Sequence, residues 1–185
     1  MIIHLKEHGL YLGVLALKEV QIDDVRAFLQ SLSESLGGVE FQVLNLRLVA
    51  GLRHILTSVL VALEAFRHGL NIANTVSMEV LVRASAQRQI SRALRQLGVK
   101  RGCQDLVLVL MDKDRGRVEE TVAKLNEMYA GRLDEGLLEA DRSSHIMETY
   151  GLSDEMVKAE EAYVKSLWDA VKNLVAEKVV LTLVA

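Results

Sequence analysis

Residues 105–111 read "DLVLVLM", and the fold that we expect for this chain is built around them. Its six residues after Asp105 are all apolar, and no polar residue interrupts them. A short run of this kind is typical of a strand that is buried on both faces, at the centre of a sheet. The neighbouring strands, and the helices that cover them, should lie on either side of it in the chain.

Two strand-like segments precede this central strand. Residues 10–17 form a β-prone apolar run, and residues 41–48 alternate imperfectly between polar and apolar side chains. The helix between them is expected to begin after Asp24, whose negative charge suits a helix N-terminus, and to end at Gly37. A second, longer helix is expected from Gly51 to Gly69 because apolar residues recur there at helical spacing.

The C-terminal part of the chain predicts further helices and a last strand. A helix is expected at residues 118–130, a long loop at 132–151, and one continuous helix at 154–177. The β-branched segment "KVVLTLVA" at 178–185 predicts the last strand. This order predicts a mixed α/β fold, in which a small, largely antiparallel sheet is covered by helices, in a single domain of residues 1–185.

Several function classes lack support in this sequence. The longest strongly apolar stretches fall well short of the roughly 20 residues that a membrane span needs. The N-terminal residues lack the basic and apolar regions of a secretory signal, so we expect a cytoplasmic protein. No phosphate-loop, dinucleotide or zinc-protease motif occurs, and no paired Cys-x-x-Cys. We therefore expect a protein that is not an enzyme, with no cofactor, metal, small-molecule substrate or membrane partner.

One segment has an unusual charge. The whole chain has a formal net charge of −3, with 22 basic and 25 acidic residues, yet residues 80–104 contain no acidic side chain. That segment is expected to form two short helices, joined near residues 84–87 and closed by Gly98. Its basic residues are Arg83, Arg88, Arg92, Arg95, Lys100 and Arg101.

A helical wheel brings three of these arginines together. With about 100° between successive residues, Arg88, Arg92 and Arg95 share one narrow face, and the opposite face is apolar. The residues of the apolar face are Ile90, Ala93, Leu94 and Leu97. An ordinary surface helix would place Glu four residues from Arg to relieve the repulsion. Arginine also forms forked contacts to phosphate and stacks on bases, which favours a nucleic-acid ligand. The alternative, left open by charge alone, is a solvated basic face or one neutralised by carboxylates.

The same segment resembles a known family. The residues that carry the resemblance are "SMEVLVRAS" at 77–85, "RQI" at 88–90, Ala93, and the stop at Gly98 and Val99. With weaker similarity upstream, the chain resembles the kinase-binding subunit family of the KEOPS complex over about residues 1–112, in particular its archaeal members. In animals this family is known as the PRPK-binding protein. Ala86 stands where the family often has glycine, and residues 131–160 match no family segment that we can name.

The resemblance implies an adaptor without catalytic activity. The KEOPS assembly places threonylcarbamoyl on the adenosine beside the tRNA anticodon, and this family binds the small KEOPS kinase, an ATPase, and captures tRNA by its single-stranded 3′ CCA end. A single strand needs cations for its phosphates and planar or apolar surfaces for its bases. The residues expected to bind RNA are Arg83, Arg88, Arg92 and Arg95 for phosphates, Gln89 for a base edge, Val82 and Val99 as apolar surfaces, and Arg53 and His54 as weaker additions.

The C-terminal helix is the expected site of contact with the kinase. In the resembled family this region contacts the kinase, and Trp168 is the preferred anchor because tryptophan is enriched in interface hot spots. Val171, Leu174 and Val175 continue the same apolar line, which is also typical of a helix face buried in a core. The second functional hypothesis is a protein-only scaffold whose basic helix face binds an acidic protein.

Overall fold

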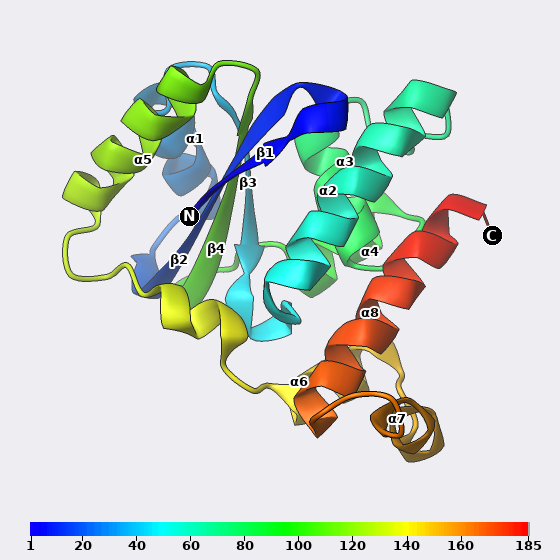
Figure 1. Cartoon of the computed structure of the whole chain (residues 1–185). Coiled ribbons are helices and arrows are strands. Elements are labelled where there is room, and N and C mark those ends of the chain that lie inside the picture. Colours follow the sequence, from blue (N-terminus) through cyan, green and yellow to red (C-terminus); the bar gives the residue numbers. More distant parts are fainter. Residues whose placement is uncertain (185) are drawn as a thin grey trace. The chain divides into compact units, whose positions relative to one another are not determined.

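The computed structural model describes residues 1–184, which fall into two compact units (Figure 1). Unit 1 comprises residues 1–46 and 99–137, and unit 2 comprises residues 47–98 and those from 138 onward. Each unit is therefore built from two stretches that lie far apart in the sequence. The prediction that the whole chain forms a single domain stays a prediction.

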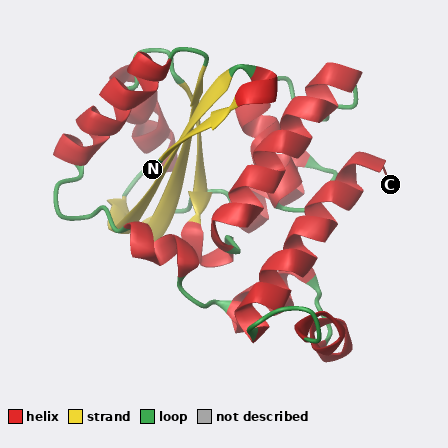
Figure 2. Ribbon diagram, in the orientation of Figure 1, coloured by secondary structure: helices red, strands yellow, loops and turns green. Residues whose placement is uncertain are grey.

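Unit 1 is built on a four-stranded antiparallel sheet, with strand order β1-β2-β4-β3 (Figure 2). Its strands are β1 (Ile2–Leu5), β2 (Leu10–Ile22), β3 (Glu40–Asn45) and β4 (Gly102–Asp112). The "DLVLVLM" run lies within β4, where residues 106–111 are buried and pair with β2 on one side and β3 on the other. The expected central strand is confirmed.

Two helices cover one face of this sheet, and a hydrophobic core lies between them and the strands. Helix α1 (Val25–Ser35) begins where the sequence predicted, because the side chain of Asp24 accepts a hydrogen bond from the amide of Ala27 at 2.8 Å. Helix α5 (Arg115–Met128) follows β4. Leu32 of α1 and Leu125 of α5 pack into one cluster with the sheet residues Leu15, Leu17, Val43, Leu106, Leu108 and Leu110.

Unit 2 is helical. Its helices are α2 (Gly51–His68), α3 (Val76–Ala84), α4 (Ile90–Leu97), α6 (Ser143–Tyr150), α7 (Asp154–Glu161) and α8 (Leu167–Val184). Helices α3 and α8 both pack on α2, while α6 and α7 pack on α8.

Short 3₁₀ turns occur at Lys6–His8, Leu46–Leu48 and Glu135–Glu139. Within residues 1–184, every helix is too short or too polar to cross a membrane.

Three predictions for the C-terminal region are wrong. Residues 132–151 are not a long loop, since they contain the third 3₁₀ turn and all of α6. The helix expected at 154–177 is interrupted between α7 and α8, because Ser166 starts a new helix by accepting a hydrogen bond from the amide of Asp169 at 3.1 Å. The last strand is also wrong, since residues 178–184 continue α8.

Packing explains the missing last strand. Val179 is fully buried, and the backbone carbonyl of Thr182 accepts a tertiary hydrogen bond from Arg83, which suits a helix end. Tertiary contacts of this kind override the weak preference of β-branched residues for strands. The predicted α/β class, with an antiparallel sheet covered by helices, is confirmed.

Candidate nucleic-acid interface

The turn between α3 and α4 is held in a defined shape by its own polar groups. The hydroxyl of Ser85 donates to the carbonyl of Val82 at 2.7 Å and accepts from the amide of Gln87 at 3.2 Å. Ala86 has a φ of 51°, in the left-handed region that favours glycine. The Cβ of alanine makes this conformation strained. Glycine, which the KEOPS kinase-binding subunit family often has at this position, would relieve the strain.

Arg88 lies in this turn and not on the helix that follows it. Helix α4 begins at Ile90, with Gln89 as its N-terminal cap residue, so the wheel does not determine where Arg88 points. The prediction that Arg88, Arg92 and Arg95 share one helical face is wrong for Arg88. Arg92 and Arg95 are three residues apart on α4 and do share a face, and both are exposed.

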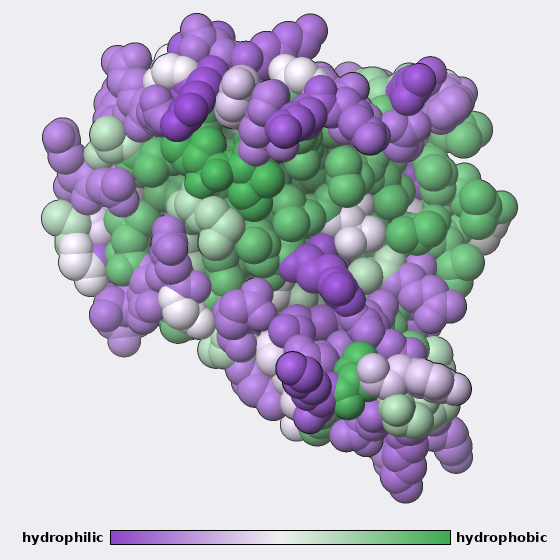
Figure 3. All heavy atoms as spheres, in the orientation of Figure 1, coloured by the Kyte–Doolittle hydropathy of each residue, from purple (hydrophilic) through white to green (hydrophobic). Residues whose placement is uncertain are grey.

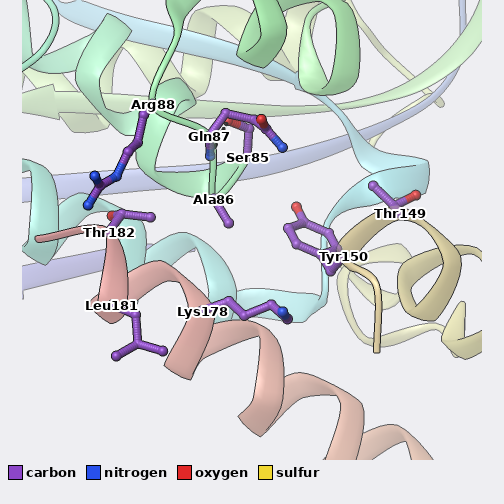
Figure 4. Close-up of a pocket in the computed structure, with 9 residues that line it drawn as sticks. All are labelled: Ser85, Ala86, Gln87, Arg88, Thr149, Tyr150, Lys178, Leu181 and Thr182. Atoms are coloured by element: carbon purple, nitrogen blue, oxygen red, sulfur yellow. Dashed lines mark hydrogen bonds between the residues drawn. The ribbon is translucent and has the colours of Figure 1, made fainter. Parts of the chain in front are cut away.

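The side chain of Arg88 instead lines a pocket of about 300 Å³ within unit 2. Its lining residues are Ser85, Ala86, Gln87, Arg88, Thr149, Tyr150, Lys178, Leu181 and Thr182 (Figure 4). The turn, α6 and α8 thus each provide part of the wall. None of these nine residues carries a carboxylate, so two cations, Arg88 and Lys178, set the charge of the pocket.

Neither cation is neutralised within the part of the chain that the structure describes. Arg88 is exposed and Lys178 is half-buried, and neither forms a hydrogen bond or an ion pair with any of residues 1–184. In Figure 4 the guanidinium of Arg88 points toward Thr182, and the ammonium of Lys178 points toward Tyr150. Two like charges in one concave site, without a counterion, attract anions and concentrate them there.

Tyr150 forms a rigid, neutral part of the wall. Its hydroxyl donates toward two backbone carbonyls, those of Leu48 at 3.1 Å and Ala84 at 2.9 Å. Burial raises the pKa of Tyr150 far above its usual value, so the hydroxyl stays protonated. The aromatic ring and the side chain of Leu181 give the pocket apolar surface beside its cations.

Two amide side chains join α4 to the turn. Gln96 of α4 donates to the carbonyl of Ser85 at 3.2 Å and accepts from the side chain of Gln87 at 3.1 Å. Gly98 follows the helix as its C-cap residue, and this position requires glycine because a Cβ there would lie 2.4 Å from the carbonyl oxygen of Leu94. The exposed Gln89, Arg92 and Arg95 are therefore carried on a helix that is fixed to the pocket wall.

Arg83 is turned inward, which corrects its predicted role as a surface cation for RNA. It is 1% exposed, and its Nε donates to Oε1 of Glu79 at 2.7 Å. Its two terminal nitrogens donate to the carbonyls of Thr182 at 2.6 Å and Leu70 at 2.8 Å. With these groups occupied, Arg83 has no free face for a phosphate.

The remaining RNA-binding candidates do not gather at the pocket. Val82 is fully buried and offers no apolar surface to a base. Val99 belongs to unit 1 and packs against its core. Arg53 is exposed, but it donates a hydrogen bond to Asn173 and lines a different pocket of unit 2, together with Glu139, Lys172 and Asp169.

His54 has a structural role. Its Nδ1 accepts from the amide of Ala50 at 3.1 Å, so its Nε2 carries the proton and donates to the carbonyl of Ala84 at 2.8 Å. The ring also meets the Tyr150 ring edge to face, with 5.6 Å between centroids. Burial lowers the pKa of His54 from 6.5 to about 4, although the hydrogen bond to Ala84 opposes that shift. His54 is therefore a neutral core residue, and its burial leaves none of it accessible to RNA in this structure.

The predicted kinase-contacting line of α8 lies in the core of unit 2. Trp168 and Leu174 are each 7% exposed, and Val171 and Val175 are fully buried in the cluster that includes Ile146. The indole of Trp168 donates to the carbonyl of Glu139 at 3.1 Å. Contact of these side chains with a kinase stays a prediction, and the present packing leaves little of them accessible.

Other residues of α8 are exposed instead. Val180 and Leu181 are nearly half exposed and Val184 is 78% exposed, at the C-terminal end of the helix. Figure 3 shows apolar side chains gathered at the right of the view, where Figure 1 places this end of α8.

Sequence reasoning missed the residues that complete the pocket, above all Lys178. Its segment was expected to be a strand, and nothing in the local pattern relates it to Arg88. Thr149 and Tyr150 were missed for a similar reason, because they fall in the segment expected to be a loop. The carboxylate-free lining becomes visible only when the turn, α6 and α8 are brought together.

The fold and the pocket define a small α/β protein with a carboxylate-free pocket that Arg88 and Lys178 line. Comparison with known proteins is consistent with a binding protein: the model of the family "Kinase binding protein CGI-121" matches residues 20–180. The chain belongs to this family, which confirms the resemblance found in the sequence.

A relative from Methanocaldococcus jannaschii bears the name "Regulatory protein Cgi121". It is 37% identical to this chain over 102 residues, which cover 55% of this chain and 62% of the relative. The chain thus matches less than two thirds of the length of this relative.

Proposed function

We propose that the protein is a non-catalytic, cytoplasmic adaptor subunit of the KEOPS complex, which binds the KEOPS kinase and recruits tRNA through its single-stranded 3′ CCA end. The observation that carries the RNA part is the pocket in which Arg88 and Lys178 lie without a counterion among residues 1–184. The kinase part is supported by membership of a family described as kinase binding.

The pocket suits the end of a single strand better than a duplex. A volume of about 300 Å³ accommodates one nucleotide and not a double helix. Its cations would pair with phosphates, while the Tyr150 ring and Leu181 would contact a base. Arg92 and Arg95, on the helix that follows, would contact the phosphates of preceding nucleotides.

The C-terminal end of α8 is the surface that we propose for the kinase. It exposes Val180 and Val184, both apolar and large enough to enter a pocket on a partner. Since the buried line around Trp168 holds unit 2 together, we assign the kinase contact to these exposed residues and not to Trp168.

Binding of tRNA with and without its 3′ CCA end tests the RNA proposal. We expect the intact tRNA to bind at least about tenfold more tightly than the trimmed tRNA, at one fixed salt concentration, because the trimmed form lacks the segment that enters the pocket. Equal binding of both would contradict capture of the 3′ end.

The alternative, a protein-only scaffold whose basic face binds an acidic partner, is supported by the exposed Arg92 and Arg95. In that case both forms of the tRNA would bind weakly, in proportion to their length.

A further inference from the structure

We propose that Arg83 is a positioning residue that seats the C-terminal end of α8, so that Lys178 and Thr182 line the same pocket as Arg88. The RNA readout of this proposal rests on the proposed function, whereas the seating of α8 does not.

The contacts of Arg83 join three parts of unit 2. One terminal nitrogen donates to both the carbonyl and the hydroxyl of Thr182, at 2.6 and 3.1 Å, and the other donates to the carbonyl of Leu70 at 2.8 Å. Arg83 itself is near the end of α3, and Leu70 follows α2. One side chain therefore fixes α8 to both of these helices.

Glu79 completes this arrangement from the other side. One of its carboxylate oxygens pairs with Nε of Arg83 at 2.7 Å, and the other accepts from the amides of Ile72 and Ala73 at 2.9 and 2.7 Å. Glu79 is fully buried, so the pair has been removed from water. A buried pair contributes little net stability in general, but it fixes geometry because each partner is costly to leave alone.

The position of Thr182 connects this pair to the pocket. Thr182 lines the pocket, and Lys178 lies one helical turn earlier on the same helix. The carbonyl that Arg83 holds belongs to the last turn of α8, where helix carbonyls lack partners within the helix. Without this contact, the end of α8 would be free to move, and the separation between Lys178 and Arg88 would no longer be fixed.

The planar guanidinium explains why arginine suits this position. Its donors point in several fixed directions, here toward Glu79, Leu70 and Thr182 at once. Lysine would keep the charge beside Glu79 and could reach one or two of these acceptors, but not all three in the same geometry.

Two variants separate seating from charge. Arg83→Lys retains a cation for Glu79. The double variant Glu79→Gln with Arg83→Met removes both charges, and the new amide oxygen can still accept from Ile72 and Ala73. Paired spin labels on Ser91→Cys and Val180→Cys, with Cys103→Ser, report the distance from α4 to the end of α8. Ser91, Val180 and Cys103 are exposed.

We expect the distance distribution to be narrow in the parent protein and broad in both Arg83 variants, without RNA present. We also expect tRNA affinity to fall about tenfold, with an unchanged dependence of log K on log salt, since every phosphate ligand is still in place.

An unchanged, narrow distribution in both variants would overturn the proposal. A salt slope that falls together with the affinity would also overturn it, because Arg83 would then be a phosphate ligand. If the parent protein does not bind the 3′ end at all, the proposed function fails, and the distance measurement alone decides the role of Arg83.

Discussion

Arg88 and Lys178 line the same pocket, although one lies in the turn before α4 and the other lies on the C-terminal helix. The fold of unit 2 thus adds a cation from α8 to the positive charge of the arginine-rich segment. This pairing gives the arginine-rich segment a concave site at its N-terminal end. It also makes the position of α8 a condition for the RNA binding that we propose.

Charge reversal in the arginine-rich segment should weaken RNA binding in a salt-dependent way. For Arg88→Glu with Arg92→Glu, we expect weaker tRNA binding and a smaller salt slope. The slope should fall by roughly 0.7 for each phosphate of a single strand that the variant no longer binds. A titration over several salt concentrations measures both quantities.

Arg26→Glu is the control for Arg88→Glu alone, because both change the net charge equally and Arg26 is an exposed arginine of unit 1 that has no partner among the described residues. A similar decrease in affinity in this control would indicate a general effect of net charge and not a defined site.

The buried His54 should make stability depend on pH above the range where carboxylates titrate. Its pKa is about 4 in the folded protein and 6.5 as the ordinary value, so the unfolded chain takes up a proton first as pH falls. The resulting decrease in the free energy of unfolding is absent well above pH 6.5 and grows as pH falls toward 4. Between about pH 7.5 and pH 5 we expect a decrease of about 2 kcal/mol in the free energy of unfolding.

Denaturant titrations of the parent protein and of His54→Gln measure this decrease. The variant should lack most of this pH dependence. If the free energy of unfolding falls equally in both proteins over this range, His54 is not the group responsible.

The strained Ala86 predicts a stabilising substitution. Glycine adopts this left-handed conformation without the steric strain that alanine has there, and we expect Ala86→Gly to increase the free energy of unfolding by about 0.5 to 1 kcal/mol. Ala27→Gly, on the exposed face of α1, should instead cost about 1 kcal/mol. Lower stability in both variants would show that the methyl group of Ala86 matters more for packing than for strain.

Kinase binding and stability should separate along α8. Val184→Asp changes a side chain that is 78% exposed, so it should weaken kinase binding and alter stability by no more than about 0.5 kcal/mol. Trp168→Ala removes a buried ring and should cost about 3 to 5 kcal/mol in stability. Pull-down with the kinase and thermal unfolding compare the two. If Trp168→Ala keeps its stability but no longer binds the kinase, the direct contact predicted from the sequence would be supported instead.

Patterns of local sequence were sufficient for the parts of the fold that follow local rules. The apolar run in β4, the Asp24 cap of α1 and the glycine boundaries of α2 each act within a few residues, and each was predicted. The segment from 132 onward was not, because its elements are fixed by tertiary contacts. Helix α8 is the clearest case, since its β-branched end is helical where Val179 is buried and Arg83 holds Thr182.

The site was predictable only in part for the same reason. Arg88, Gln89, Arg92 and Arg95 could be found from charge and spacing, and all four are exposed. The same charge pattern included Arg83, because a sequence does not reveal that Glu79 and two carbonyls occupy a guanidinium. The charge pattern did not include Lys178, which lines the pocket because of how α8 packs.

The most direct test of the proposed function combines the pocket variant with the trimmed tRNA. Affinities of the parent protein and of Lys178→Glu would be measured for intact tRNA and for tRNA without its 3′ CCA end. If the pocket holds that end, the substitution should weaken binding of the intact tRNA by about tenfold and leave binding of the trimmed tRNA nearly unchanged. An equal decrease in affinity for both forms would contradict capture of the 3′ end by this pocket.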